Sequence, residues 1–344
     1  MNSTQANTSS DEITPLPIIT IQICMVIAGI LSIISILANS YILYVIFINK
    51  DLRSASFYGL ANLSIANLVV AFTFPITPLF VLITYNSPLQ HSEAIKLVLC
   101  CFILPSSVVA LQAANGSLAF IAIEKYYTIV RHAYPRRQLH RRKVLTILIG
   151  LWIIGILQHW PRSIIVLDRS SIPNICTLFT QDDLMRNIML VAATIIHIYP
   201  FIIMLICHVK IAKTLKQRHR FFISAAILRQ LKFRSFNQGG RQTQRLNNAI
   251  KMLRRVAQIQ FICCTTGVIS MLTFVIGYAT KLNSYVVGFA YAISYIALVA
   301  TGLHGPILYI LCLRKFRQPL ESHLLSIQCW PKWIRFKKID SALI

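Results

Sequence analysis

The stretch IITIQICMVIAGILSIISILANSYILYVIFI, residues 18–48, contains no charged side chain and exceeds the roughly 20 residues that a helix needs to cross a bilayer. Hydrophobic residues make up 56% of the 344-residue chain and charged residues 13%, against about 45–50% and about 25% in soluble domains. Six further apolar stretches follow the first one, which predicts an all-α membrane protein built as a seven-transmembrane helix bundle. The predicted spans are residues 18–48, 56–84, 96–130, 144–167, 184–211, 249–280 and 284–313.

Basic residues predict the orientation of these spans. Of the 34 Lys and Arg residues, 28 lie in or next to the segments that follow the first, third, fifth and seventh spans, whereas five lie on the opposite side. Because basic loops remain in the cytosol, the N-terminus is predicted to be extracellular and the C-terminus cytosolic. The cations lie next to the span ends, so the net charge of +24 predicts contact with anionic lipids of the inner leaflet and an acidic cytosolic partner, and no nucleic acid.

The chain divides into three segments. Residues 1–17 form a polar extracellular tail, in which Asn2 and Asn7 begin N-x-S/T acceptor sequences and are predicted to be glycosylated. Residues 18–313 form the transmembrane bundle, and residues 314–344 follow it on the cytosolic side. No stretch outside the bundle is long enough for a second folded domain.

The segment after the last span carries an amphipathic pattern. Phe316, Leu320 and Leu324 are four residues apart and therefore share one helical face, behind several basic residues. This predicts a short cytosolic helix on the inner leaflet. Cys329, beyond that helix, is a candidate for palmitoylation.

Three of the nine cysteines lie near the predicted outer face, where disulfides persist. A bridge between the start of the third span and the loop before the fifth span would hold that loop over the mouth of the bundle. The prediction is Cys100–Cys176, and Cys101 is the alternative to Cys100, because the direction of the Cβ atom decides between neighbours. No Cys or His pattern has zinc-ligand spacing, so no metal site is predicted.

Several sequence motifs occur in one order along the spans. The third span ends with Glu124-Lys125-Tyr126 in IAIEKYYTIV, which matches a D/E-R-Y triplet with Lys in place of Arg. Pro306 and Tyr309 lie over N-P-x-x-Y. Other positions that match are Asn39, Asn67, Trp152, Pro161, Pro200 and Phe261.

From Asn39 to about Leu325 the chain thus resembles the rhodopsin-like (class A) G-protein-coupled receptors. The resemblance implies a multi-pass receptor of the plasma membrane that passes an extracellular signal to heterotrimeric G proteins through movement of helices three, five and six. It implies neither an enzyme nor a cofactor. The activation switch that it implies comprises Glu124, Lys125, Tyr126, His208, Phe261, Pro306 and Tyr309.

The chain departs from the family pattern at several of these motifs. Asn67 stands where an Asp usually anchors sodium, and a hard cation prefers anionic oxygen ligands, so no sodium site is expected. Thr265 and Gly267 replace a Trp and a Pro, and Gly305 replaces an Asn. No Asp or Glu occurs between Asp183 and Glu321, so helix six cannot supply the carboxylate that holds helix three at rest in many relatives, and appreciable basal activity is expected.

The ligand class follows from the positions that would face the outer mouth by family analogy. They are apolar with a few hydroxyl groups, which suits an apolar small molecule or a peptide side chain. The predicted ligand-binding residues are Thr77, Ser107, Leu111, Gln112, Ala192, Ile196, Val268, Leu272, Tyr295 and Val299.

Two functions other than a coupling receptor compete for the same sequence pattern. A receptor-shaped protein that binds a ligand without activating G proteins has the same sequence pattern and is the main alternative. A transporter or channel would need ionisable residues near the middle of the membrane, whereas the pair Glu124 and Lys125 lies at a span end.

Overall fold

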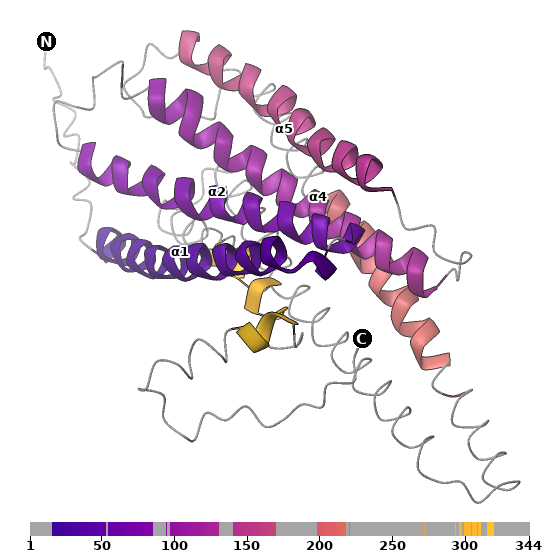
Figure 1. Ribbon diagram of the computed structural model, residues 1–344. Helices are drawn as coiled ribbons and strands as arrows, with labels where there is room; N and C mark the ends of the chain where they lie inside the picture. The colour runs from indigo at the N-terminus through magenta and orange to yellow at the C-terminus, as the bar shows by residue number, and fades with distance from the viewer. Residues whose placement is uncertain are drawn as a thin grey trace, which may run out of the picture.

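The computed structural model describes the first four predicted spans and parts of the later ones (Figure 1). The described residues are 16–52, 54–84, 94, 97–130, 140–169, 198–217, 220, 272, 293, 296–297, 299–303, 305–307, 309–310 and 315–319. The main elements are α1 (Leu16–Ile48), the 3-10 turn η1 (Lys50–Leu52), α2 (Ala55–Thr84), the π-helix η3 (Val98–Ile103), α4 (Leu104–Ile129) and α5 (Arg141–Arg169).

A further helix, called the fifth helix below, covers Ile198–Gln217. Five helices in the described part of the chain are long and apolar enough to cross a membrane. The predicted fifth span ends at residue 211, but the helix continues six residues further. Hydropathy marks where the hydrocarbon ends rather than where the helix ends. The added residues, 212–217, are good helix formers except for Thr214.

The described helices pack side by side around α2 (Figure 1). α2 packs against α1 and α4, and α5 packs mainly against α4. Glycines permit close approach at two crossings, because a Cβ atom on Gly59 would lie 2.9 Å from Ile121 and one on Gly116 would lie 2.7 Å from Leu151. Small residues at helix contacts are typical of membrane bundles.

The hydrophobic core lies where α1, α2, α4 and α5 meet, at the end of the bundle that is predicted to face the cytosol and is called the inner end below. Its buried side chains include Ile42, Leu60, Phe120, Val144 and Phe316. Large apolar side chains on the outward faces are exposed, such as Leu37, Phe47 and Leu157. This inside-out distribution fits helices that are surrounded by lipid.

The third predicted span is not one regular helix. It begins with the π-helix η3 and continues as α4, with Pro105 in the first turn of α4. The rings of Phe102 in η3 and Trp160 in α5 meet edge to face, with centroids 6.2 Å apart. Apolar residues give no local signal for i→i+5 hydrogen bonding, so the sequence predicted a single helix here.

Candidate functional site

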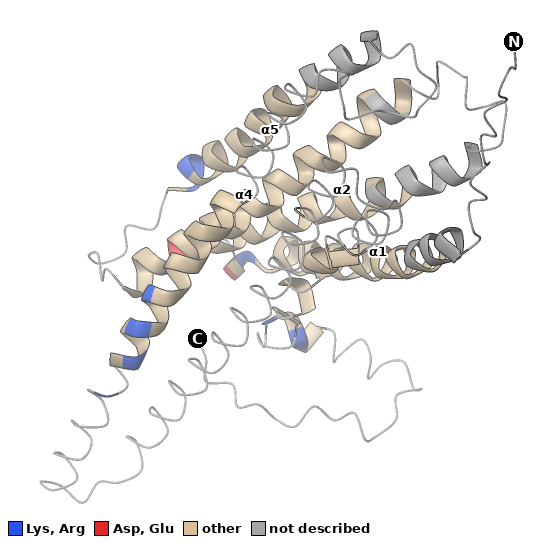
Figure 2. Ribbon diagram, turned by 180° about the vertical axis from the view of Figure 1, so that it is seen from behind, with Lys and Arg blue, Asp and Glu red and all other residues tan. Residues whose placement is uncertain are grey.

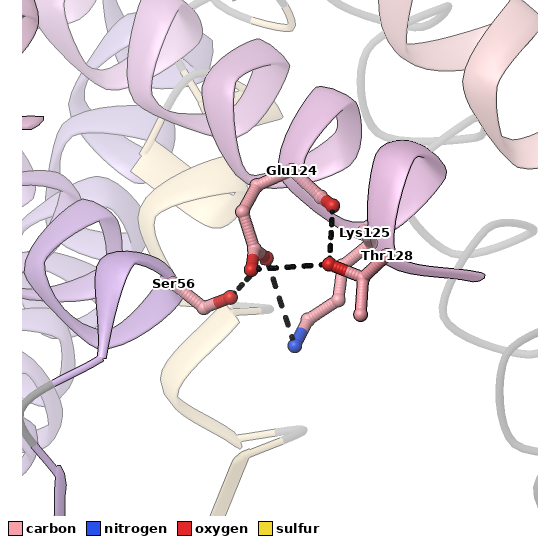
Figure 3. A network of polar contacts seen from close by, with 4 residues as sticks. All are labelled: Ser56, Glu124, Lys125 and Thr128. Atoms are coloured by element: carbon pink, nitrogen blue, oxygen red, sulfur yellow. Dashed lines mark hydrogen bonds and ion pairs between the residues drawn. The ribbon is translucent and has the colours of Figure 1, made fainter. Parts of the chain in front are cut away.

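The carboxylate of Glu124 lies at the centre of a polar cluster at the inner end of α4 (Figure 3). Ser56 of α2 donates a hydrogen bond to it, and the Thr128 hydroxyl lies 3.4 Å from Oε1 and donates to the Glu124 carbonyl at 2.8 Å. Lys125 Nζ lies 3.8 Å from Glu124 Oε2. The Lys125 side chain is 47% exposed and that of Glu124 only 18%, so the carboxylate is held in place while the ammonium group stays accessible.

The next residue, Tyr126, faces the fifth helix. Lys210 Nζ lies 5.5 Å from the centroid of its ring. The rings of Tyr126 and Tyr127 form a T-shaped pair with centroids 5.6 Å apart. Each residue turns a helix by about 100°, so consecutive side chains contact different neighbouring helices. The triplet thereby links α2 and the fifth helix through α4.

His208, another predicted member of the activation switch, lies on the fifth helix. Its neighbours Met204 and Cys207 are buried against Ala122 of α4. The structure therefore brings the helix that carries His208 against the helix that carries Lys125. In this arrangement the Lys125 ammonium is paired with Glu124.

A second group of predicted residues surrounds the end of the last span. Pro306 is fully buried, and the ring of Tyr309 lies 6.1 Å from that of Phe316. The ring centroid of Phe57 of α2 also lies 6.1 Å from that of Phe316. The Tyr41 hydroxyl of α1 donates to the Phe316 carbonyl at 2.6 Å.

The environment of Phe316 corrects one expectation. The amphipathic pattern placed Phe316 on a face toward the inner leaflet, yet its side chain is fully buried in the bundle core. Residues 315–319 are helical, whereas Leu320 and Leu324 lie outside the described residues. Three aromatic residues from other segments surround Phe316, and no local pattern could reveal them.

A neutral polar network lies further inside the bundle. Asn39 Nδ2 donates to the Ser35 carbonyl at 2.8 Å and to the Gly302 carbonyl at 3.1 Å. Asn67 Nδ2 donates to Asn39 Oδ1 and to the same Gly302 carbonyl, both at 3.3 Å. Asn39 and Asn67 are buried. The network joins α1, α2 and the last span by amide and carbonyl groups without any charge.

A further network had only one predicted member, Trp152 of α5. Trp152 Nε1 donates to Asn62 Oδ1 at 3.0 Å, and Asn62 Nδ2 donates to Ser117 Oγ at 2.8 Å. The chain of hydrogen bonds joins α5, α2 and α4. Asn62 and Ser117 were missed as members, although isolated polar residues on the inward face of an apolar span indicate hydrogen bonds between helices.

Three of the predicted ligand-binding residues contact neighbouring helices. The Ser107 hydroxyl is buried 2.8 Å from Thr73 Oγ1, and Gln112 Nε2 lies 2.7 Å from Gln158 Oε1. Val299 is buried against Ala28 of α1. Leu111 and Leu272 are partly buried. The side chains of Thr77, Ala192, Ile196, Val268 and Tyr295 lie outside the described part.

Among the predicted modification sites, the cysteines of the third span are partly described. Cys101 is a buried free thiol. The remaining predicted residues, Cys176, Asn2, Asn7, Cys329 and Phe261, and the side chain of Cys100, lie outside the described residues.

Cations gather at the inner end of the described helices, at the start of α5 and on the last turns of the fifth helix (Figure 2). The sequence pattern of the family described as "7 transmembrane receptor (rhodopsin family)" matches residues 38–309, which carry both the triplet and Pro306-x-x-Tyr309. The chain belongs to this receptor family. Membership makes it a multi-pass protein of the plasma membrane and a signalling receptor rather than an enzyme.

Individual relatives of this receptor are distant. It is 25% identical over 202 residues to C-X-C chemokine receptor type 2 of Mus musculus, over 57% of this chain and 53% of the relative. It is 25% identical over 204 residues to C-X-C chemokine receptor type 1 of Oryctolagus cuniculus, over 57% and 54%. It is 22% identical over 194 residues to C-C chemokine receptor type 8 of Homo sapiens, over 54% and 52%. The chain spans about half the length of the curated relatives it matches.

Proposed function

We propose that this receptor binds an extracellular peptide of the chemokine class and activates heterotrimeric G proteins, with Glu124 and Lys125 as the switch. The observation that carries the proposal is that Glu124 and Lys125 differ in hydrogen bonding and in exposure to solvent. Ser56 and Thr128 hold the carboxylate, while the ammonium group 3.8 Å away is nearly half exposed. The names of the relatives as chemokine receptors support the ligand class.

Release of Lys125 costs little free energy in this arrangement. An exposed ion pair contributes about 0–1 kcal/mol, and Glu124 keeps its hydrogen bonds to Ser56 and Thr128 after Lys125 leaves. The freed ammonium group can then bind a G protein and His208 on the fifth helix. His208 must be a neutral imidazole to accept from Lys125, because an imidazolium would repel it.

Lys125 makes this switch weaker than an Arg would. A lysine ammonium group is a strongly hydrated point charge, whereas a guanidinium group offers five N–H donors in a planar fork. Helix six has no carboxylate to hold helix three at rest, since no Asp or Glu occurs between Asp183 and Glu321. We therefore propose appreciable basal activity.

The test is G-protein activation by wild type, Lys125→Arg and Lys125→Ala at matched surface expression, without ligand and with a panel of purified chemokines. We expect Lys125→Arg to equal or exceed wild type and Lys125→Ala to lose most activity. Lys213→Ala, which removes an exposed cation from the fifth helix, is the matched control and should change activity less. Wild-type activity in Lys125→Ala would show that the pair is only a solvated helix end.

The alternative function is ligand binding without G-protein activation. Lys125 in place of Arg, and Thr265, Gly267 and Gly305 in place of the family's Trp, Pro and Asn, favour it. If a chemokine binds to cells that express wild type, and wild type and both Lys125 variants stay silent, the alternative holds.

The modifications and flanking segments belong to the same proposal. Residues 1–17 form the glycosylated extracellular tail, with Asn2 and Asn7 as acceptors, and Cys100–Cys176 bridges the outer mouth. Residues 314–344 lie in the cytosol, where Cys329 is palmitoylated. Loss of a palmitate label in Cys329→Ser tests the last of these claims.

A further inference from the structure

The fifth helix contacts α4 at the inner end of the bundle through one apolar face (Figure 1). Met204, Cys207 and Ile211 follow the i, i+3, i+7 spacing of that face and are buried. The first two pack with Ala122 of α4. Tyr126, one turn further along α4, packs against the same cluster. Tyr126 therefore lies at the inner edge of the contact between the two helices.

A lysine beside this face reaches the ring of Tyr126. Lys210 is exposed, and its Nζ atom lies over the ring at 5.5 Å from the centroid. A distance below about 6 Å allows a cation–π contact, in which the negative face of the ring attracts the ammonium group. Among the described residues, no carboxylate lies within ion-pair distance of Lys210. In this part of the chain the ring of Tyr126 is thus the partner of the Lys210 charge.

A second cation–π contact at the inner end joins a different pair of helices. The guanidinium carbon of Arg141, at the start of α5, lies 5.4 Å from the ring centroid of Tyr58 in α2. α5 also packs along α4, and Gly116 and Gly155 let these two helices approach closely at two positions. The Arg141 contact therefore adds little to the position of α5, which its packing already determines.

We infer that Lys210 is a positioning residue that holds the fifth helix against α4 in the resting receptor. The inference rests on the proposed function, in which the fifth helix moves and Lys125 reaches His208. Helix six has no carboxylate to hold helix three, so the contact of Lys210 with Tyr126 takes over part of that restraint. An outward shift of the fifth helix draws the ammonium group away from the ring and must overcome their attraction.

The charge of Lys210 acts in the same direction as its contact with the ring. Lys210 lies two residues after His208, the proposed acceptor for the released Lys125. Two ammonium groups repel each other, so Lys210 disfavours the approach of Lys125 to the fifth helix. Removal of Lys210 therefore shifts the population toward the active arrangement.

The first test measures the position of the fifth helix in the absence of a G protein. The full-length receptor in lipid nanodiscs carries spin labels on ketone-bearing residues that replace Lys50 of η1 and Gln217 of the fifth helix, both exposed. Lys210→Met keeps an unbranched side chain and removes the charge. It should raise the ratio of the long-distance to the short-distance population about 2- to 5-fold. Lys210→Arg keeps a cation and should resemble wild type.

Changes to the ring separate a cation–π contact from a general effect of charge. Tyr126→Phe keeps the aromatic face and should keep the short distance, whereas Tyr126→Leu should shift the population as Lys210→Met does. Because the contact needs both partners, Tyr126→Leu combined with Lys210→Met should shift the population little further than Lys210→Met alone.

Two variants that remove other cations at the inner end are the controls. Arg141→Met removes the cation–π contact of α5, and Lys213→Met removes an exposed charge of the fifth helix. Neither should change the distance distribution or raise basal G-protein activation at matched surface expression. Lys210→Met should raise basal activation about 2- to 5-fold in the same assay.

Three results would overturn the inference: an unchanged distance distribution in Lys210→Met, an equal shift in either control, or a shift in Tyr126→Phe as large as in Tyr126→Leu. Failure of the proposed function looks different. If Lys210→Met shifts the distances as expected while wild type and every variant fail to activate G proteins, Lys210 does restrain the fifth helix and only the proposed signalling function is wrong.

Discussion

Two polar clusters in this receptor differ in charge, depth and composition. The network of Asn39, Asn67 and the Gly302 carbonyl is buried and contains only neutral amide and carbonyl groups. The cluster of Glu124, Lys125 and their neighbours at the inner end of α4 contains a charged pair, one member of which is nearly half exposed. Both clusters join α2 to another helix.

The difference follows from the cost of removing a group from water. A neutral amide in the bundle needs only hydrogen-bond partners, and Asn39 and Asn67 provide them for each other. An ionised group needs a counter-charge or solvent, and the inner end of the helices offers both. The buried network therefore serves stability, and the exposed pair is free to serve a conformational change.

The largest effect is expected for Asn39→Ala. The substitution removes donors to Ser35 and Gly302 and the acceptor for Asn67, so buried groups lose their partners. We expect a loss of about 3 kcal/mol in the free energy of unfolding, seen as a lower melting temperature of the purified receptor. Ser40→Ala, at the exposed next position, is the control. Equal melting of both variants would mean that the network contributes no stability.

Asn67→Asp should give a smaller effect that depends on sodium. The new carboxylate would face two acceptors, Asn39 Oδ1 and the Gly302 carbonyl, which now accept from the Asn67 amide at 3.3 Å. We expect a loss of about 1–3 kcal/mol without sodium and partial recovery when sodium supplies the missing charge. The melting temperature of wild type should be the same in sodium chloride as in choline chloride. The melting temperature of Asn67→Ala should likewise not depend on which of the two salts is present. Sodium stabilisation of wild type would contradict the expected absence of a sodium site.

Glu124→Gln should have the smallest effect on stability. A glutamine can still accept from Ser56, and the lost ion pair is partly exposed, so the free energy of unfolding should fall by less than about 1 kcal/mol. Basal G-protein activation should rise, because Lys125 is released. Asp51→Asn, an exposed acid of η1 at the same end, is the control. Destabilisation as large as in Asn39→Ala would remove the distinction between the two clusters.

Long apolar stretches predicted the helices well. α1 ends at Ile48 and α2 at Thr84, as predicted, and α5 extends the predicted fourth span by three residues at its start and two at its end. The backbone N–H and C=O groups of a membrane helix form their hydrogen bonds within the same segment, so length and hydropathy suffice to find such a helix. The resemblance to the family also placed Glu124 and Lys125 in one switch, and Lys125 Nζ lies 3.8 Å from Glu124 Oε2.

Contacts between distant segments could not be predicted in this way. Burial of Phe316 depends on Tyr41, Phe57 and Tyr309, and the donor to Glu124 is a serine 68 positions earlier in the chain. Hydropathy is a property of each segment, whereas these contacts depend on which helix faces meet. By itself the sequence determined the described membrane helices, the family and the charged triplet. Only the tertiary structure decided the partners of Glu124, Phe316 and Gln112, because packing brings together side chains that have no relation in the linear chain.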